Sequence, residues 1–313
     1  MMDQKGKMIV LTGPTAVGKT ALSIALAKEI GGEIISADSM QVYKYMDIGS
    51  AKITKDEMQG VKHYLIDVLE PSEEFNVYRF QQMAKEAVKE IYQKGHIPIV
   101  VGGTGFYIQA LLYDIDFSTE EDHNAFRIEL ERLAAEKGSA YLHAQLEEVD
   151  SVSAKEIHPN NQKRIIRALE FYQLNGEKIS DHNQKERQKE AAYDFSYFVL
   201  TDDRKRLYQR IDERVDAMLE KGLLEEVRHL KEMGYQRNMV SMQGLGYKEL
   251  LSYLSGECTL DEAIYLIKRS TRRFAKRQLT WFRRERDVIW LERARFDNNL
   301  QNILNFILKN IKI

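Results

Sequence analysis

One segment near the amino terminus constrains this chain more than any other feature. It reads GPTAVGKT, from Gly13 to Thr20, and it lies between the apolar run Met8–Leu11 and a helical stretch. A strand, a glycine-rich loop and a helix in this order form a P-loop, in which backbone N–H groups and the helix amino terminus surround an anion. Lys19 is expected beside the terminal phosphate, with the Thr20 hydroxyl available to Mg²⁺. The segment therefore predicts a polyphosphate site without saying which polyphosphate binds.

The composition is that of an ordinary soluble globular protein. Of the 313 residues, 43% are hydrophobic and 30% charged, which suits one large domain or two smaller ones. The apolar run that follows MMDQKGK is too short for a signal peptide, and no run approaches the roughly 18 apolar residues of a membrane span. The single cysteine, Cys258, excludes an internal disulfide and a cysteine-rich zinc finger. We expect a cytoplasmic protein that is not inserted in a membrane.

Short β-rich runs alternate with amphipathic helical stretches at both ends of the chain. This alternation predicts an α/β fold with a P-loop NTPase-like parallel sheet flanked by helices. Between residues 118 and 191 the patterns are helical only, so we expect an all-helical insertion domain at 118–191 within a core made of 1–117 and 192–313. The expected strands are Met8–Thr12, Glu33–Ala37, Tyr64–Val68, Ile97–Val101, Phe195–Leu200 and Val288–Leu291.

Polar and small residues follow two further strands of the expected sheet. Asp38 follows one strand, and Gly102-Gly103-Thr104-Gly105 follows another. Because the carboxyl ends of parallel strands line the ligand crevice, both segments are expected near the phosphates. Asp38 can serve as a Mg²⁺ ligand, a general base or a helix cap, and the glycines either admit a ligand or form a turn. No acidic Walker-B residue follows these strands; Asp67 is the nearest look-alike and is equally typical of a surface residue.

Basic residues are concentrated in three places, although the formal net charge is only −2. Near the carboxyl terminus, basic residues at helical spacing form a stripe that suits either a polyanion or a solvated helix face. The second group is a row of arginines on a helix expected from Arg204 to about Lys221, and this row faces either phosphates or solvent. The third group lies in the insertion and suits either contact with RNA or surface ion pairs. The three groups are Arg269, Arg272, Arg273 and Lys276; Arg206, Arg210 and Arg214; and Lys163, Arg164 and Arg167. Trp281, beside the first group, is expected to pack on the core rather than to stack on bases.

Together these motifs resemble those of one family, the tRNA dimethylallyltransferases, also called tRNA isopentenyltransferases. The resemblance covers essentially the whole chain, with the motifs in the same order. The chain is similar to the shorter bacterial form of the family, which binds tRNA without a zinc finger. Such enzymes move the dimethylallyl group of dimethylallyl diphosphate to N6 of the adenosine at tRNA position 37, beside the anticodon, and release pyrophosphate. The matching segments are Gly13–Thr20, Ile35–Tyr43, His63–Asp67, Val101–Tyr107, His158–Asn160 with Arg164 and Arg167, Gly246-Tyr247 and Thr271–Trp281.

The resemblance implies a role for each group of residues. Asp38 would accept a proton from N6, Thr104 would orient the reacting groups, and Lys19 with Mg²⁺ would neutralise the departing pyrophosphate. The implied Mg²⁺ ligands are Thr20 and Asp38. The residues implied at the diphosphate are Gly13, Pro14, Thr15, Ala16, Val17, Gly18, Lys19 and Thr20, with one arginine of the row Arg206, Arg210 and Arg214; we take Arg210, although the sequence does not settle which of the three it is. Those implied at the anticodon stem-loop are Asp38, Ser39, Met40, Gln41, Thr104, Arg127, Lys163, Arg164, Ile165, Ile166, Arg167, Arg272 and Lys276.

Three other functions share part of this pattern. They are an isopentenyltransferase of free adenine nucleotides, a P-loop kinase of small molecules, and a P-loop RNA-binding protein without chemistry. The helical insertion and the basic carboxyl-terminal stripe favour tRNA over a free nucleotide. Met40 departs from the family pattern, in which glutamine is common at this position. We expect a monomer.

Overall fold

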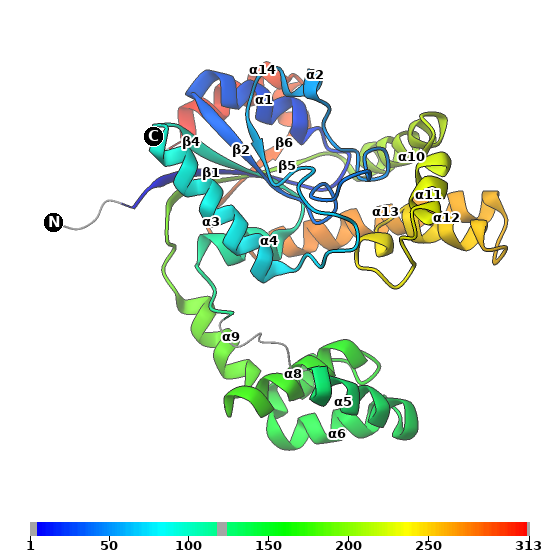
Figure 1. Ribbon diagram of the computed structural model, residues 1–313. Coiled ribbons are helices and arrows are strands. Elements are labelled where there is room, and N and C mark those ends of the chain that lie inside the picture. Colours follow the sequence, from blue (N-terminus) through cyan, green and yellow to red (C-terminus); the bar gives the residue numbers. More distant parts are fainter. Residues whose placement is uncertain (1–4, 118–123, 312–313) are drawn as a thin grey trace. The chain divides into compact units, whose positions relative to one another are not determined.

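Six parallel strands form one sheet in the order β3-β2-β4-β1-β5-β6 (Figure 1). The structure is a computed structural model that describes residues 5–117 and 124–311. The strands are β1 (Lys7–Thr12), β2 (Gly32–Ala37), β3 (His63–Tyr64), β4 (Ile97–Gly102), β5 (Asp194–Thr201) and β6 (Val288–Glu292). The predicted α/β fold is confirmed, and every strand except β3 lies within one residue of its predicted bounds at each end.

The third predicted strand was wrong in its extent. Of the run Tyr64–Val68 only Tyr64 belongs to β3, because Leu65 and Asp67 both have a φ of 60°, which ends the extended conformation. Asp67 is exposed and its carboxylate lies 2.9 Å from Lys52 Nζ. The residue that resembles a Walker-B acid in the sequence therefore forms a surface ion pair.

Helices cover both faces of the sheet (Figure 1). α1 (Lys19–Ile30) and α14 (Leu300–Asn310) lie on one face, while α3 (Val77–Gln93) and α4 (Gly105–Leu112) lie on the other. The other helices outside residues 113–191 are α2 (Lys55–Met58), α10 (Arg204–Glu220), α11 (Leu223–Glu232), α12 (Tyr247–Leu254) and α13 (Leu260–Phe282), with the 3₁₀ turns η1 (Ser241–Gln243) and η2 (Arg293–Phe296). None of the helices in the described ranges is both long and apolar enough to span a membrane.

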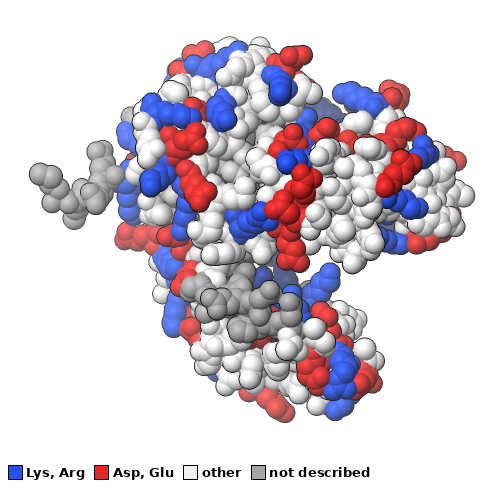
Figure 2. All heavy atoms as spheres, in the orientation of Figure 1, with Lys and Arg blue, Asp and Glu red and all other residues white. Residues whose placement is uncertain are grey.

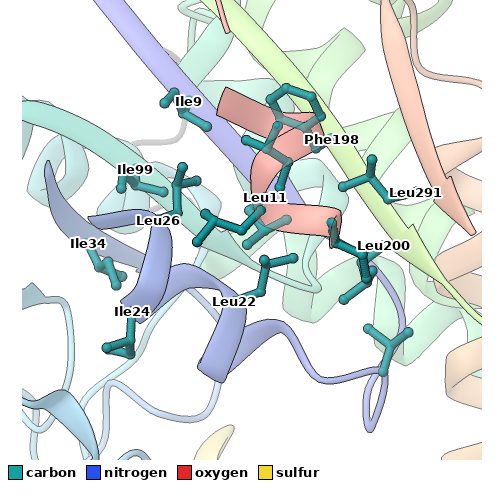
Figure 3. Close-up of a cluster of buried hydrophobic side chains, with 14 of the residues drawn as sticks. Ile9, Leu11, Leu22, Ile24, Leu26, Ile34, Ile99, Phe198, Leu200 and Leu291 are labelled. Atoms are coloured by element: carbon teal, nitrogen blue, oxygen red, sulfur yellow. The ribbon is translucent and has the colours of Figure 1, made fainter. Parts of the chain in front are cut away.

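An apolar core fixes the loop between β1 and α1. Leu11 on β1 and Leu22 on α1 are both almost completely buried, and side chains from β2, β4, β5 and β6 surround them (Figure 3). Strands that are apolar almost throughout, such as β4, suit a parallel sheet covered on both faces. Burying each side chain of this size contributes about 1.5–3 kcal/mol, so the two ends of the P-loop are firmly held.

The chain divides into two compact units, one of residues 1–112 and 192–313 and the other of residues 113–191. The second unit is helical throughout its described residues and has a core of its own, which includes Leu142, Leu146 and Ile165. Its helices are α5 (Asn124–Lys137), α6 (Ser139–Val149), α7 (Ser151–Glu156), α8 (Gln162–Asn175) and α9 (Ile179–Gln188). The expected boundary at residue 118 lies outside the described residues. α8 begins at Gln162, after the segment His158–Asn160, in which Pro159 disfavours helical backbone at His158.

Candidate active site

The carboxyl ends of five neighbouring strands carry the polar groups of the candidate site. Because the strands are parallel, all five ends lie at one edge of the sheet, where ligands of such sheets bind. In sheet order, β2 is followed by Asp38, β4 by Gly103 and Thr104, β1 by the P-loop, β5 by Asp202, and β6 by Arg293. The structure therefore brings together the three segments that the sequence places at the reacting centre.

The P-loop depends on glycine at both ends. Gly13 has a φ of 148° and a Cβ there would lie 2.2 Å from the Leu200 carbonyl oxygen, while Gly18 has a φ of 98°. Lys19 Nζ donates to the carbonyl oxygens of Gly13 and Pro14, both at 2.9 Å, so the ammonium lies against the loop. Thr20 is exposed in the first turn of α1. The segment from Pro14 to Val17 spans the turn between the two glycines, as expected for a phosphate cradle.

Two positive groups and one carboxylate meet at the loop. The pKa of Lys19 is lowered to about 8, chiefly by burial and also by repulsion from Arg214, while attraction to Asp38 opposes the shift. Burial also lowers the pKa of Arg214, again against the attraction of Asp38. Among the three arginines of the row on α10, Arg214 is therefore the one whose charge acts on Lys19. Two half-buried cations near one carboxylate leave a positive excess that favours an anion.

Asp38 and Thr104 lie at adjacent strand ends. Asp38 Oδ1 accepts hydrogen bonds from the backbone N–H groups of Met40 at 2.8 Å and Gln41 at 3.4 Å, so the carboxylate does cap a turn. Among the described residues no hydrogen bond reaches Oδ2, which is left to accept a proton or bind a cation. The Thr104 N–H donates to the Ala37 carbonyl oxygen at 3.2 Å, which holds the threonine beside the residue that precedes Asp38.

Gln278 on α13 joins two loops of the site, and sequence reasoning missed it. Its Oε1 accepts from the Thr15 N–H and its Nε2 donates to the Gly103 carbonyl oxygen, both at 3.0 Å. A Cβ on Gly103 would lie 2.1 Å from that Nε2, so any larger residue there would displace the Gln278 amide. The one signal in the sequence was the position of Gln278 within the Thr271–Trp281 motif. Trp281 packs against Gly105, consistent with a core role.

A group of arginines around Asp202 flanks the P-loop, and sequence reasoning missed its centre. The Asp202 carboxylate is fully buried and lies 3.6 Å from Arg210 Nη1, 3.7 Å from Arg206 Nε and 3.8 Å from Arg293 Nε. Arg293 Nη1 also donates to the Val17 carbonyl oxygen at 3.2 Å. Arg210, the arginine expected at the diphosphate, is thus paired with Asp202. The cap of α10 is Asp203, so Asp202 is free for this role.

Comparison with known proteins now identifies the family. The family model described as IPP transferase matches residues 41–285. The chain belongs to this family. The tRNA dimethylallyltransferase of Lachnoclostridium phytofermentans is 61% identical over 292 residues, 93% of each chain. A crystal structure of the tRNA isopentenylpyrophosphate transferase of Bacillus halodurans is 44% identical with a TM-score of 0.73, over 97% of this chain and 96% of that one. A eukaryotic dimethylallyltransferase acting on tRNA is 32% identical with a TM-score of 0.82, over 98% of this chain and 81% of that one.

The residues that the family resemblance implied at tRNA differ in exposure within the insertion. Lys163, Arg164 and Arg167 are exposed on α8. Ile165 and Ile166, which face the other way, are 0% and 4% exposed in the core of this unit, so the expectation that they meet RNA was wrong for their side chains. A helix that must bury one face cannot present five consecutive residues to a ligand.

Two further basic residues of the chain have acidic partners. Arg127 donates to both carboxylate oxygens of Glu170, at 2.9 and 2.7 Å. Arg272 Nη1 lies 2.7 Å from Asp212 Oδ2 on α10, whereas Lys276 is exposed. Figure 2 shows the same mixture over the face it draws, where basic and acidic side chains alternate. The carboxyl-terminal stripe is therefore partly neutralised, and its exposed part begins one turn later than the spacing alone indicates.

Proposed function

We propose that this chain transfers the dimethylallyl group of dimethylallyl diphosphate to N6 of the adenosine at tRNA position 37 and releases pyrophosphate. The observation that carries the proposal is that the P-loop with Lys19 and the segment with Asp38 follow strands at one sheet edge, where Arg214 lies within the electrostatic field of both groups. Such a site neutralises a diphosphate and accepts a proton, which are the two needs of this reaction. Relatives named tRNA dimethylallyltransferase, 51–61% identical over most of the chain, support it.

The P-loop supplies the diphosphate site in this proposal. Its backbone N–H groups and the amino terminus of α1 bind the phosphate oxygens, and Lys19 leaves the carbonyl groups of Gly13 and Pro14 to pair with them. Arg214 adds a second positive charge. Arg210 and Arg293, paired with Asp202 on the Val17 side of the loop, raise the positive potential around the leaving group.

The transfer step uses Asp38 as the base. The lone pair of N6 forms a bond to C1 of the allyl group, the bond from C1 to the diphosphate oxygen breaks, and its electron pair leaves with pyrophosphate. The N6 proton passes to the Asp38 carboxylate, for which Oδ2 is available because Oδ1 accepts the backbone bonds. Thr104 orients the reacting groups. An exocyclic amine is a weak nucleophile, so orientation supplies much of the acceleration.

Thr20 and Asp38 are the residues that we propose as Mg²⁺ ligands. Both offer oxygen atoms, and Mg²⁺ is commonly held by one or two protein oxygens together with phosphate oxygens of the substrate. When bound, Mg²⁺ neutralises charge on the diphosphate. In the described ranges no cluster of three or more histidine, cysteine, aspartate or glutamate side chains forms a metal site, which is consistent with a metal held largely by substrate.

The nucleic-acid part of the proposal rests on two sets of residues, one half-buried beside Asp38 and one exposed on α8. Ser39, Met40 and Gln41 follow Asp38 directly and would contact the adenine after it leaves the anticodon stack. Lys163, Arg164 and Arg167 would bind phosphates of the same stem-loop. We infer that the protein acts as a monomer in the cytoplasm.

Incubation with labelled dimethylallyl diphosphate and Mg²⁺ tests the proposal, with unmodified tRNA or AMP as acceptor. Label is expected in tRNA, and it should be lost in Asp38→Asn but retained in Asp56→Asn, an exposed carboxylate on α2. Label in AMP alone would identify an enzyme of free nucleotides. Consumption of ATP without transfer of label would identify a kinase.

A further inference from the structure

We propose that Glu226, on α11, is a positioning residue for the reaction: it fixes the segment Asp38–Gln41 against the substrate base. The inference rests on the proposed function, in which Asp38 accepts the N6 proton and Ser39–Gln41 contact adenine. Glu226 is distant from this segment in the sequence.

The Glu226 carboxylate anchors a turn of the loop that follows β2. Oε2 accepts from the backbone N–H groups of Asp47 at 2.9 Å and Ile48 at 2.7 Å. Oε1 accepts from the Gly49 N–H at 3.0 Å and from the Tyr247 hydroxyl at 2.7 Å. Hydrogen bonds to an ionised acceptor are roughly twice as strong as neutral ones, so the three from the turn attach it firmly to α11.

The anchored turn continues directly into contacts with the base-contacting segment. Gln41 Nε2 donates to the carbonyl oxygens of Ser50 at 3.4 Å and Ala51 at 3.3 Å, and its Oε1 accepts from Ser36 Oγ at 3.2 Å. The N–H groups of Met40 and Gln41 in turn donate to Asp38 Oδ1. A continuous series of contacts thus runs from Glu226 through the turn and Gln41 to the proposed base.

The loop needs this support because its own backbone is unfavourable. Tyr45 and Ala51 have φ values of 64° and 47°, a left-handed conformation that non-glycine residues adopt only when their surroundings impose it. Lys52 adds two internal restraints, since its Nζ donates to the Tyr43 carbonyl oxygen at 2.7 Å and to Asp47 Oδ1 at 2.5 Å. Without the external carboxylate, the three N–H groups of the turn would have no common acceptor.

Close packing from the same helices reinforces the attachment. A Cβ on Gly49 would lie 2.5 Å from the Tyr247 ring, and a Cβ on Gly244 would lie 2.5 Å from Met40 Cε. The stretch from Gly244 to Tyr247, which leads into α12, therefore meets both the turn and the base-contacting segment. Tyr247 is completely buried, and burial together with Glu226 raises its pKa well above the usual value, so its hydroxyl remains a donor.

The test compares Glu226→Gln with Glu225→Gln in the full-length protein. The Glu226→Gln change replaces one acceptor oxygen by an NH2 group, which cannot accept hydrogen bonds from the N–H groups of the turn. Glu225, in contrast, is exposed and pairs with Arg228 at 3.4 Å. For Glu226→Gln we expect kcat for transfer to tRNA to fall at least tenfold while pyrophosphate affinity, measured by calorimetry, stays within twofold of wild type. Glu225→Gln should leave both unchanged. Tyr247→Phe removes one of the four bonds and should lower kcat about threefold.

Equal kcat values for wild type, Glu226→Gln and Glu225→Gln would overturn the inference. So would a parallel fall of kcat and pyrophosphate affinity, since that indicates general damage to the core. If Glu226→Gln fails to fold, Tyr247→Phe decides, and a wild-type kcat in that variant contradicts the inference. A wild-type protein that binds pyrophosphate but transfers no label to tRNA would instead contradict the proposed function.

Discussion

At the scale of single residues, the charge state of Lys19 controls the candidate site. The ammonium lies against the phosphate cradle, and its pKa is lowered to about 8 by burial and by Arg214. An anion favours the protonated form, so a diphosphate binds the protein that carries the proton. Below pH 8 this form dominates, and above pH 8 the lysine becomes neutral.

The first prediction follows from that pKa. Affinity for dimethylallyl diphosphate should be level below pH 8 and should fall about tenfold by pH 9, because binding must then supply the missing proton. Lys19→Arg keeps its charge over this range and should show no such fall. The ratio of the two affinities, measured by calorimetry from pH 6.5 to 9.5, cancels the ionisation of the ligand. A constant ratio would show that Lys19 does not titrate near pH 8.

The second prediction separates two arginines of the α10 row. Arg214→Gln should weaken pyrophosphate binding at least tenfold, because it removes a charge in the field of Lys19, and it should raise the pKa of Lys19. Arg210→Gln should weaken binding only about threefold, since that guanidinium is paired with Asp202. Calorimetry at pH 7 and the pH dependence of each variant check both effects. A larger effect in Arg210→Gln would identify Arg210, and not Arg214, as the arginine at the diphosphate.

Residues next to each other in the sequence were the ones that could be predicted. The P-loop and the segments after β2 and β4 carry their chemistry within eight or fewer residues, so their meeting followed from the rule for parallel strands. Gln278 and Arg293 reach the same loop from more than 250 positions away. Their approach depends on how α13 and β6 pack, which no local pattern encodes.

At the scale of elements, α13 contributes rigidity rather than a uniform basic surface. Arg272 is paired with Asp212, and Lys268 lies 2.7 Å from Asp216, so α10 neutralises the near side of the stripe. On its buried side, Gln278 ties the P-loop to the Gly103 loop. The helix thereby keeps the P-loop, the proposed diphosphate site, in register with the Thr104 segment.

The third prediction tests this link. Gln278→Met keeps the side-chain volume but leaves the Thr15 N–H and the Gly103 carbonyl without partners. We expect the free energy of unfolding to fall by about 2–3 kcal/mol, because each buried group left unbonded costs about 1–3 kcal/mol. Urea denaturation measures the change, with the exposed Gln209→Met on α10 as the control. Equal stability of the two variants would mean that water replaces the missing hydrogen bonds.

The predicted boundaries of a strand were wrong where the backbone conformation differs from what the composition indicates. The apolar run after Tyr64 has the composition of a strand, but positive φ at Leu65 and Asp67 turns it away from the sheet. Its continuation bonds instead to the loop after β2, with the Val68 N–H donating to the Val42 carbonyl oxygen at 2.8 Å. The run bonds to this loop in place of the sheet because of where the loop lies in three dimensions, which the sequence does not reveal.

At the scale of the whole molecule, the two units have separate cores. The insertion buries Leu142, Leu146 and Ile165 among its own helices, and the P-loop unit buries the side chains around Leu11 and Leu22. The chain leaves the P-loop unit after Leu112 and re-enters it at Ala192, whose N–H donates to the Leu112 carbonyl oxygen at 2.8 Å. Exit and return are therefore adjacent, as in domains that accept insertions without rearrangement.

The last prediction separates diphosphate chemistry from tRNA binding. Replacing residues 113–191 by a short glycine-serine linker should leave the P-loop unit folded, because a linker of a few residues spans the adjacent ends at Leu112 and Ala192. Pyrophosphate affinity should stay within about threefold, since the residues at the diphosphate all lie within the retained unit. Transfer to tRNA should fall at least a hundredfold, because the exposed Lys163, Arg164 and Arg167 are removed with the insertion.

A milder variant removes only those three charges. Changing Lys163, Arg164 and Arg167 together to glutamine should weaken tRNA binding and make it less dependent on salt, by up to about one unit of slope for each phosphate that is no longer neutralised. The unit should stay folded, because Ile165 and Ile166 keep its core. Filter binding from 50 to 200 mM salt, beside calorimetry with pyrophosphate, distinguishes the outcomes. If the salt slope is unchanged, these side chains do not bind phosphates, and tRNA must be held by the exposed cations that begin at Arg273 and Lys276 on α13.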